Sequence, residues 1–175
     1  MLNIEIKLNA NGKKYALPLS EEAWEEIREV LDIDEDDFVE DDEFDVYADC
    51  DLDRYMYREN LQELEEIQKA AKDIEPELLA AILDSGVKYD RRPLTREVMA
   101  AIEAVKAGQF FFDKVTPAEY AKGRYEIAND VPMGCEEEFK AYNGDYQKMF
   151  DEQYAHECVV INDGVLYGPA LNENL

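Results

Sequence analysis

The chain is poor in positive charge and in the residues that build the commonest catalytic sites. Its 175 residues include 18 Lys or Arg against 43 Asp or Glu, with one histidine, one tryptophan and three cysteines. The formal net charge of −25 argues against direct binding of nucleic acid, because contacts to phosphate need Lys and Arg to displace condensed counterions. Basic protein surfaces are therefore the expected partners.

The sequence also lacks a membrane-spanning segment, a signal peptide and a disulfide pattern. No apolar run approaches the roughly 20 residues that a helix needs to cross a bilayer. The start, Met1 to Glu5, lacks the basic and apolar regions of a signal peptide, so we expect a cytoplasmic protein with no membrane partner. Cys50, Cys135 and Cys158 are widely spaced and odd in number, which predicts buried or idle thiols.

Motifs for catalysis and for cofactor binding are absent as well. The chain contains no P-loop, no Gly-x-Gly-x-x-Gly and no His-Glu-x-x-His. His156 lies two residues before Cys158, and on a strand both would face the same side. A Cys–His pair also needs a third group that orients it, which two strand neighbours seldom supply. We therefore expect no enzymatic activity and no cofactor.

What the chain does have is a concentration of negative charge. Between Glu21 and Asp53 the sequence places eighteen acids and one base, Arg28, in 33 residues. Charges of one sign at this density repel one another and oppose compaction. The hydrophobic content of 46% nevertheless lies well above the disordered regime. We expect a folded protein with a very acidic face.

Apolar periodicity predicts the α+β class, in three small subdomains at residues 1–58, 59–108 and 109–175. In the first, apolar residues alternate on both sides of Asn11-Gly12, as is typical of a hairpin. Ser20 is expected to cap a helix.

An acidic loop and a strand are expected to follow that helix. Phe38 and Val39 are expected to be the apolar anchors of the stretch between Asp32 and Glu43. Residues 44–48 then alternate as a short strand whose carboxylates face outward.

Helices are predicted for the middle subdomain. Asn60 and Glu63 have the spacing of a capping box. Pro76 suits the first turn of a second helix, which Gly86 would end. Thr95 is expected to open a third helix.

Mixed structure is predicted for the last subdomain. A strand over residues 109–113 precedes a helix that begins at Thr116, and a short acidic helix is expected over residues 135–142. Alternating apolar residues around Asn162-Asp163-Gly164 predict a final hairpin.

The charge density of the acidic run allows two interpretations. B-form DNA carries one negative charge per roughly 3.4 Å along one strand. Acids at every second residue of a helix, which rises about 1.5 Å per residue, give a similar linear density. The run can therefore imitate a DNA strand, while a solvated face that only keeps the protein soluble would have the same composition.

Calcium binding is a third interpretation of the same run. When Asp32 is taken as the first position of an EF-hand loop, two further acids fall at ligand positions 3 and 5, and Glu43 falls at position 12. The sharp turn of that loop needs Gly at position 6, where this chain has Asp37. The residues after Glu43 also alternate like a strand, so the match is incomplete.

Nearly the whole chain resembles the ArdA antirestriction proteins in the order of its parts. The resemblance includes the hairpin through Asn11-Gly12, the acidic stretch that ends at Tyr47-Ala48-Asp49, and the helix that starts at Asn60. Residues 125–132, followed by residues 138–145, are similar to the family's antirestriction motif, in which Val-Pro precedes an aromatic, acidic, glycine-containing segment.

The resemblance implies an elongated homodimer of three-domain subunits that mimics bent B-DNA. Such a protein occupies the DNA-binding groove of type I restriction-modification enzymes and blocks restriction, often with methylation, without catalysis. The family is commonly carried on mobile genetic elements. An acidic inhibitor of another DNA-binding protein, such as a CRISPR nuclease, is an alternative with the same surface.

The resemblance assigns two sets of residues. The phosphate-mimicking carboxylates, which would pair with Lys and Arg of the partner, are Asp32, Asp34, Glu35, Asp36, Asp37, Glu40, Asp41, Asp42, Glu43, Asp45, Asp49, Asp51 and Asp53. The motif expected to mediate self-association comprises Asp130, Val131, Pro132, Phe139, Tyr142, Gly144 and Asp145.

Overall fold

Alternating apolar residues at the start of the chain build the first sheet of the computed structural model, which describes residues 1–87, 96–129 and 144–172. This sheet is antiparallel with the strand order β2-β1-β3. Its strands are β1 (Ile4–Leu8), β2 (Lys14–Ala16) and β3 (Phe44–Ala48). Buried Ile6 of the central strand lies opposite Tyr15 and Val46. The predicted hairpin and the predicted strand after the acidic loop are confirmed.

The first helix, α1 (Glu21–Leu31), begins at the predicted cap. The side chain of Ser20 accepts a hydrogen bond from the backbone N–H of Ala23 at 3.2 Å. Trp24 packs partly against the core, and its Nε1 donates to Glu65 of the next helix at 3.3 Å. This contact connects α1 to the middle of the chain.

Three helices form the middle of the chain: α2 (Leu61–Ala70), α3 (Pro76–Ser85) and α4 (Glu97–Lys106). Asn60 and Glu63 form the predicted capping box at the start of α2. Pro76 lies in the first turn of α3, and Gly86 ends that helix with a left-handed φ of 66°. The signals at these helix ends are local, which is why the sequence predicted them.

The start of α4 differs in one respect from the prediction. Its N-cap is Arg96, which has a left-handed φ of 83° and makes no side-chain capping bond. The predicted cap, Thr95, lies outside the described residues.

The last part of the chain forms a second antiparallel sheet with the order β4-β6-β5 and a helical pair. Its elements are β4 (Phe111–Asp113), α5 (Pro117–Ala128), α6 (Tyr146–Gln153), β5 (Cys158–Ile161), β6 (Gly164–Tyr167) and α7 (Pro169–Asn172). Thr116 caps α5 in a capping box, as predicted, and the final hairpin is confirmed. The acidic helix expected over residues 135–142 lies outside the described residues.

Gly164 shows why the second sheet needs a glycine at the turn. A Cβ built on this residue would lie 2.5 Å from the ring of Phe112 and 2.7 Å from the carbonyl oxygen of Asp113. Both belong to the adjacent strand, so any side chain here would force β4 away from β6.

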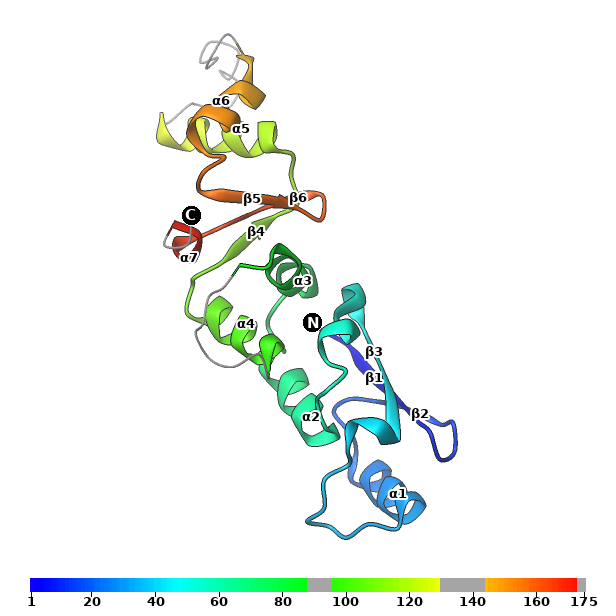
Figure 1. Ribbon diagram of the computed structural model, residues 1–175. Coiled ribbons are helices and arrows are strands. Elements are labelled where there is room, and N and C mark those ends of the chain that lie inside the picture. Colours follow the sequence, from blue (N-terminus) through cyan, green and yellow to red (C-terminus); the bar gives the residue numbers. More distant parts are fainter. Residues whose placement is uncertain (88–95, 130–143, 173–175) are drawn as a thin grey trace.

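The molecule is elongated, with α1 at one end and the α5–α6 pair at the other (Figure 1). One buried cluster runs from the first sheet through the middle helices to Phe110, Leu166 and Leu171. A smaller cluster around Tyr120, Met149 and other residues joins α5 and α6 to the second sheet. The larger core therefore includes residues of all three predicted subdomains, whose boundaries stay predictions.

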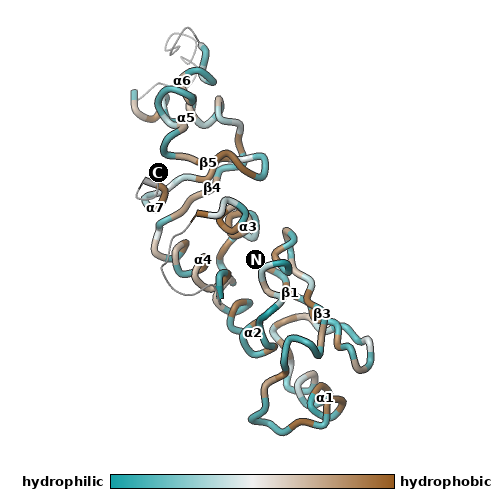
Figure 2. Tube along the Cα trace, viewed as in Figure 1, coloured by the Kyte–Doolittle hydropathy of each residue, from teal (hydrophilic) through white to brown (hydrophobic). Residues whose placement is uncertain are grey.

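The hydropathy of the chain follows this arrangement. Figure 2 shows apolar residues along α3 and the strands, and polar residues over much of α1 and the loop that follows it. Among the described residues, no helix combines the length and the apolar character that a membrane span requires.

Candidate functional site

The acidic surface consists of the thirteen carboxylates assigned above, between Asp32 and Asp53. They are carried by the C-cap of α1, the loop over residues 33–40, the 3-10 turn η1 (Asp41–Glu43), β3 and the 3-10 segment η2 (Asp49–Tyr55). Ten of the thirteen residues are exposed, three are half-buried and none is buried. The three half-buried ones are Glu43, Asp49 and Asp53.

The acidic loop is attached to the start of α2. Val39 is only 1% exposed, and its carbonyl oxygen accepts a hydrogen bond from the N–H of Leu61 at 3.0 Å. The side-chain amide of Gln62 accepts from the N–H of Val39 at 3.3 Å and donates to the carbonyl of Asp37 at 3.0 Å. One buried valine and three hydrogen bonds thus hold the loop against the body of the protein.

The expectation that Phe38 is also an anchor is wrong. This side chain is 61% exposed, while that of its neighbour Val39 is buried. Of these two adjacent side chains, only that of Val39 enters the core. The sequence pattern could not show which one.

Asn9, from the hairpin loop, holds the turn η1. Its backbone N–H donates to the carbonyl of Glu43 and its side-chain amide donates to the carbonyl of Asp42, both at 2.9 Å. Phe44 then enters the core while Asp45 stays exposed, so the predicted outward direction of the β3 carboxylate is confirmed. The turn and the strand therefore present their acids on a fixed backbone.

No cation within the described part of the chain forms an ion pair with any of the thirteen carboxylates. The hydrogen bonds that their side chains accept within the described residues come from neutral groups: Asp49 accepts from the backbone and side-chain amides of Asn3 at 2.9 and 2.8 Å, and Asp37 accepts from the N–H of Asp34 at 3.0 Å. The charge of the surface is therefore left for solvent ions or for a basic partner.

Sequence reasoning left the acids of α1 out of this surface. Glu21, Glu22, Glu25 and Glu29 are exposed on the helix that leads into the acidic loop. Hydrogen bonds from its own backbone N–H and from the hydroxyl of Ser20 hold the pKa of Glu22 below its usual value. The helical spacing of the apolar residues would have identified these side chains as outward-facing.

The twelve-residue spacing of an EF-hand does not produce the EF-hand arrangement. Asp32 ends α1 with a left-handed φ of 56°, and the chain enters β3 after Glu43 in place of a second helix. Across residues 1–87, 96–129 and 144–172, no group of three or more His, Cys, Asp or Glu side chains is placed to hold a metal ion.

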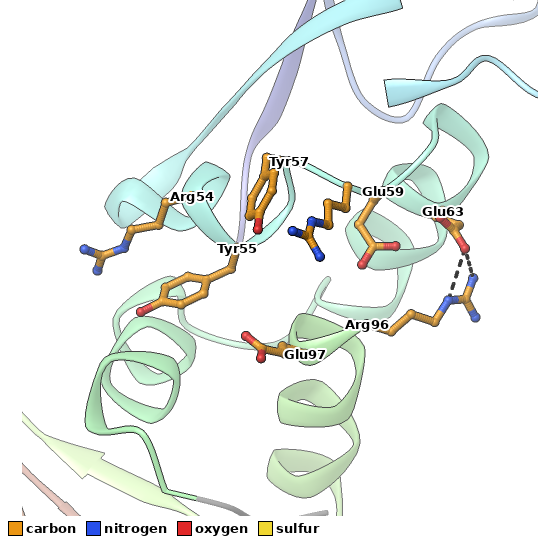
Figure 3. A pocket seen from close by; sticks show the side chains of 8 residues that line it. Arg54, Tyr55, Tyr57, Glu59, Glu63, Arg96 and Glu97 are labelled. Carbon is orange, nitrogen blue, oxygen red and sulfur yellow. Dashed lines mark hydrogen bonds and ion pairs between the residues drawn. The ribbon is translucent and has the colours of Figure 1, made fainter. Parts of the chain in front are cut away.

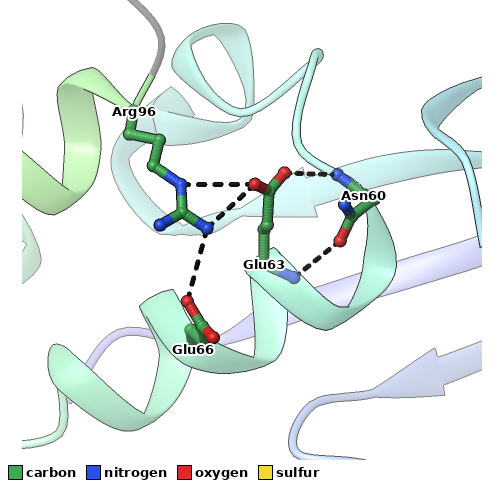
Figure 4. A network of polar contacts seen from close by, with 4 residues as sticks. All are labelled: Asn60, Glu63, Glu66 and Arg96. Carbon is green, nitrogen blue, oxygen red and sulfur yellow. Dashed lines mark hydrogen bonds and ion pairs between the residues drawn. The ribbon is translucent and has the colours of Figure 1, made fainter. Parts of the chain in front are cut away.

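A second charged region lies at the junction of α2 and α4, around a cavity of about 480 Å³. It is lined by Arg54, Tyr55, Tyr57, Arg58, Glu59, Glu63, Arg96 and Glu97 (Figure 3). Arg96 donates to one oxygen of Glu63 through Nε at 3.2 Å and Nη2 at 2.8 Å, and Nη2 lies 3.4 Å from Glu66. Glu63 also accepts from the N–H of Asn60 at 3.1 Å (Figure 4). These contacts bind the start of α2 to the start of α4.

Glu59 is the buried acid of this junction, with an exposed fraction of 6%. Burial, a hydrogen bond with Glu63 and the negative charge of Glu63 raise the pKa of Glu59 to about 7, against the opposing charge of Arg96. Burial also acts to raise the pKa of Glu63. The N–H of Asn60, the carboxyl of Glu59 and the guanidinium of Arg96 outweigh it, so this pKa is lowered. The junction thus satisfies its carboxylates internally.

Most of the predicted self-association motif cannot be placed. Asp130, Val131, Pro132, Phe139 and Tyr142 lie outside the described residues. Gly144 is exposed with a left-handed φ of 83°, and Asp145 caps α6 by accepting a hydrogen bond from the N–H of Lys148 at 3.0 Å. The two placed residues therefore shape the start of a helix.

Within the part of the chain that the structure describes, the histidine forms no hydrogen bond with a thiol. His156 precedes β5, is exposed and lies 3.4 Å from Glu157, while Cys158 is buried on the strand. Cys158 is buried, as one part of the expectation of buried or idle thiols had it, Cys50 is exposed, and Cys135 lies outside the described residues. Desolvation raises the pKa of both described thiols, which lowers the fraction of reactive thiolate.

The chain matches no protein-family model, no curated protein and no solved structure. A functional proposal therefore depends on the residues and their geometry.

Proposed function

We propose that this protein is a DNA mimic that occupies the DNA-binding groove of a type I restriction-modification enzyme, as its resemblance to the ArdA proteins implies. The observation that supports the proposal most is the acidic surface, whose thirteen carboxylates have no cation partner among the described residues. Carboxylates without an internal cation offer a basic groove what a DNA strand offers, namely a high density of accessible negative charge.

The anchoring of the acidic loop favours mimicry over a face that serves only for solubility. Solubility needs net charge but no fixed position for it. Here Val39, Gln62 and Asn9 hold the backbone of the loop and of η1 through burial and hydrogen bonds. A pre-organised surface loses less conformational entropy when it binds.

Binding would proceed without catalysis. The negative field attracts Lys and Arg of the partner over a distance set by ionic strength, about 10 Å at 0.1 M salt. Carboxylates then pair with the side chains that otherwise hold phosphate. We expect binding to weaken with added salt and inhibition to end when the protein dissociates.

Competition with DNA tests the proposal directly. The protein is titrated into a type I enzyme that holds a fluorescently labelled duplex with its recognition site, and release of DNA and loss of cleavage are measured at several salt concentrations. We expect release at low salt and a rising half-inhibitory concentration as salt increases. Unchanged binding and cleavage in excess protein, across several type I enzymes, would remove this function. The same assay with a CRISPR nuclease tests the related alternative.

A pair of matched variants separates the acidic surface from net charge. The surface variant carries Glu35→Gln, Asp36→Asn and Glu40→Gln, and the control carries Asp73→Asn, Glu75→Gln and Asp163→Asn. All six side chains are exposed and form no ion pair with the described residues, so each triple removes three charges and keeps the fold.

We expect the surface variant to inhibit roughly tenfold less well, a loss of about 1.4 kcal/mol, and the control to change inhibition by less than about twofold. Equal losses in both would show that only total charge matters. The implied homodimer is tested separately by the sedimentation coefficient of the full chain.

A further inference from the structure

One carboxylate near the end of α3 connects three segments that are far apart in the sequence. Asp84 accepts a hydrogen bond from the hydroxyl of Tyr55 at 2.6 Å and from the side-chain amide of Asn162 at 2.9 Å. It also forms an ion pair with Arg54. Arg54 and Tyr55 belong to η2, and Asn162 lies in the turn between β5 and β6. A single side chain therefore contacts both the segment that carries the acidic surface and the second sheet.

The position of α3 explains why this contact matters. The helix lies between the first sheet and the second sheet (Figure 1). Its buried residues, such as Leu79 and Ile82, share one apolar cluster with Phe110 and Leu166 of the last part of the chain. Apolar packing is non-directional, whereas hydrogen bonds and ion pairs have preferred angles. The apolar packing alone therefore leaves the relative orientation of the parts weakly specified, whereas the contacts of Asp84 are directional.

The surroundings of Asp84 are built to keep it charged and in place. Burial acts to raise its pKa, but the hydrogen bonds from Tyr55 and Asn162 and the charge of Arg54 outweigh this, so the pKa lies below its ordinary value. Asn162 and Asp163 have left-handed φ values of 50° and 57°. Such pairs form tight hairpin turns with a fixed shape, which delivers the Asn162 side chain to α3.

We propose that Asp84 is a positioning residue that fixes the orientation of the acidic surface relative to the second sheet and the α5–α6 pair. This inference rests on the proposed function, because a DNA mimic must match a groove along its whole length. If this orientation varied, one end of the molecule would no longer fit the basic groove while the other end was bound. Asp84 then contributes to inhibition without touching the partner.

A distance measurement tests the inference without any partner. Spin labels are attached through non-canonical amino acids at two exposed positions, Glu29 on α1 and Ala155 beyond α6, and unlabelled protein is added in excess. We expect a narrow distance distribution in the unmodified protein. Asp84→Ala should broaden or shift it, whereas the exposed control Asp73→Asn should leave it unchanged.

Two milder variants keep the test valid if Asp84→Ala does not fold. Tyr55→Phe removes one donor from η2 and keeps the ring, and Asn162→Gly removes the donor from the turn and tolerates its positive φ. Each should broaden the distribution with little loss of helical circular dichroism. Distributions that are unchanged in all folded variants would overturn the inference.

Inhibition is then measured with the same variants by DNA competition. We expect Asp84→Ala, or Asn162→Gly in its place, to weaken inhibition about tenfold. A broadened distribution with undiminished inhibition would overturn the positioning role. If the unmodified protein does not inhibit at all, the proposed function fails while the distance result still decides whether Asp84 sets the orientation.

Discussion

The acidic surface and the α2–α4 junction are both rich in carboxylates, but only the junction pairs carboxylates with a cation of the described chain. At the junction, Glu63 and Glu66 share Arg96, and the buried Glu59 has a pKa near neutrality. On the acidic surface, none of the thirteen carboxylates has a cation partner among the described residues. Paired acids stabilise the fold and are unavailable to a partner, whereas unpaired acids oppose compaction and stay available.

Raising the pH should lower the free energy of unfolding through Glu59 of the junction. This loss should exceed the effect of any single substitution on the acidic surface. The folded-state pKa of Glu59, about 7, exceeds its ordinary value of 4.5. Its contribution to stability is therefore complete below pH 4.5 and is lost as the pH rises through 7. We expect up to about 3 kcal/mol of this loss between about pH 5 and pH 8, from 1.4 kcal/mol per unit. Urea unfolding at stepped pH measures it, and Glu59→Gln should flatten the curve. An equal slope in that variant would contradict the assignment.

Truncation of Val39, the anchor of the acidic loop, should destabilise the protein more than truncation of its exposed neighbour Phe38. Val39→Ala removes two buried methyl groups, so we expect a loss of about 2 kcal/mol in the free energy of unfolding. Phe38→Ala, at a side chain that is 61% exposed, should cost less than about 0.5 kcal/mol. Thermal unfolding of both variants provides the measurement. Similar losses would mean that Phe38 is also buried in solution.

Breaking the ion pairs of the junction should lower the free energy of unfolding by a moderate amount. Arg96→Ala leaves Glu63 and Glu66 without their cation, but the Arg96 side chain is 46% exposed and water replaces part of the contact. We expect a loss of about 1 kcal/mol. Arg96→Lys keeps the charge without the two-point contact to Glu63 and should recover part of the loss. No change in either variant would mean that solvent fully compensates for the pair.

Neutralising the acidic surface should have the smallest effect on stability and the opposite sign. The triple variant Glu35→Gln, Asp36→Asn and Glu40→Gln relieves repulsion between like charges, so we expect a gain of about 0.5 kcal/mol at low salt. The gain should vanish near 1 M salt, where the screening length is about 3 Å. A loss of stability at low salt would show that these acids have stabilising partners.

Local signals predicted most of the described elements. Ser20, Asn60 and Thr116 cap helices because their side chains bond a backbone N–H three residues later, and that chemistry depends on sequence alone. The start of α4 at Arg96 had no such signal. The exposure of Phe38 depended on which of two adjacent side chains the fold places against α2, so periodicity could not decide it.

The same distinction between local signals and long-range contacts applies to the candidate site. Composition alone identified the run from Glu21 to Asp53, because charge is a property of the residues. The contact between Arg96 and Glu63 joins segments more than 30 residues apart, and no local pattern encodes it.

Residue type and short-range spacing were enough to predict where the negative charge lies and where most of the described helices and strands form. The packing of distant segments settled which carboxylates have a cation, which one is buried, and which one joins α3 to η2 and to the second sheet. Pairing and burial depend on which distant segments pack together, and packing is a property of the whole chain.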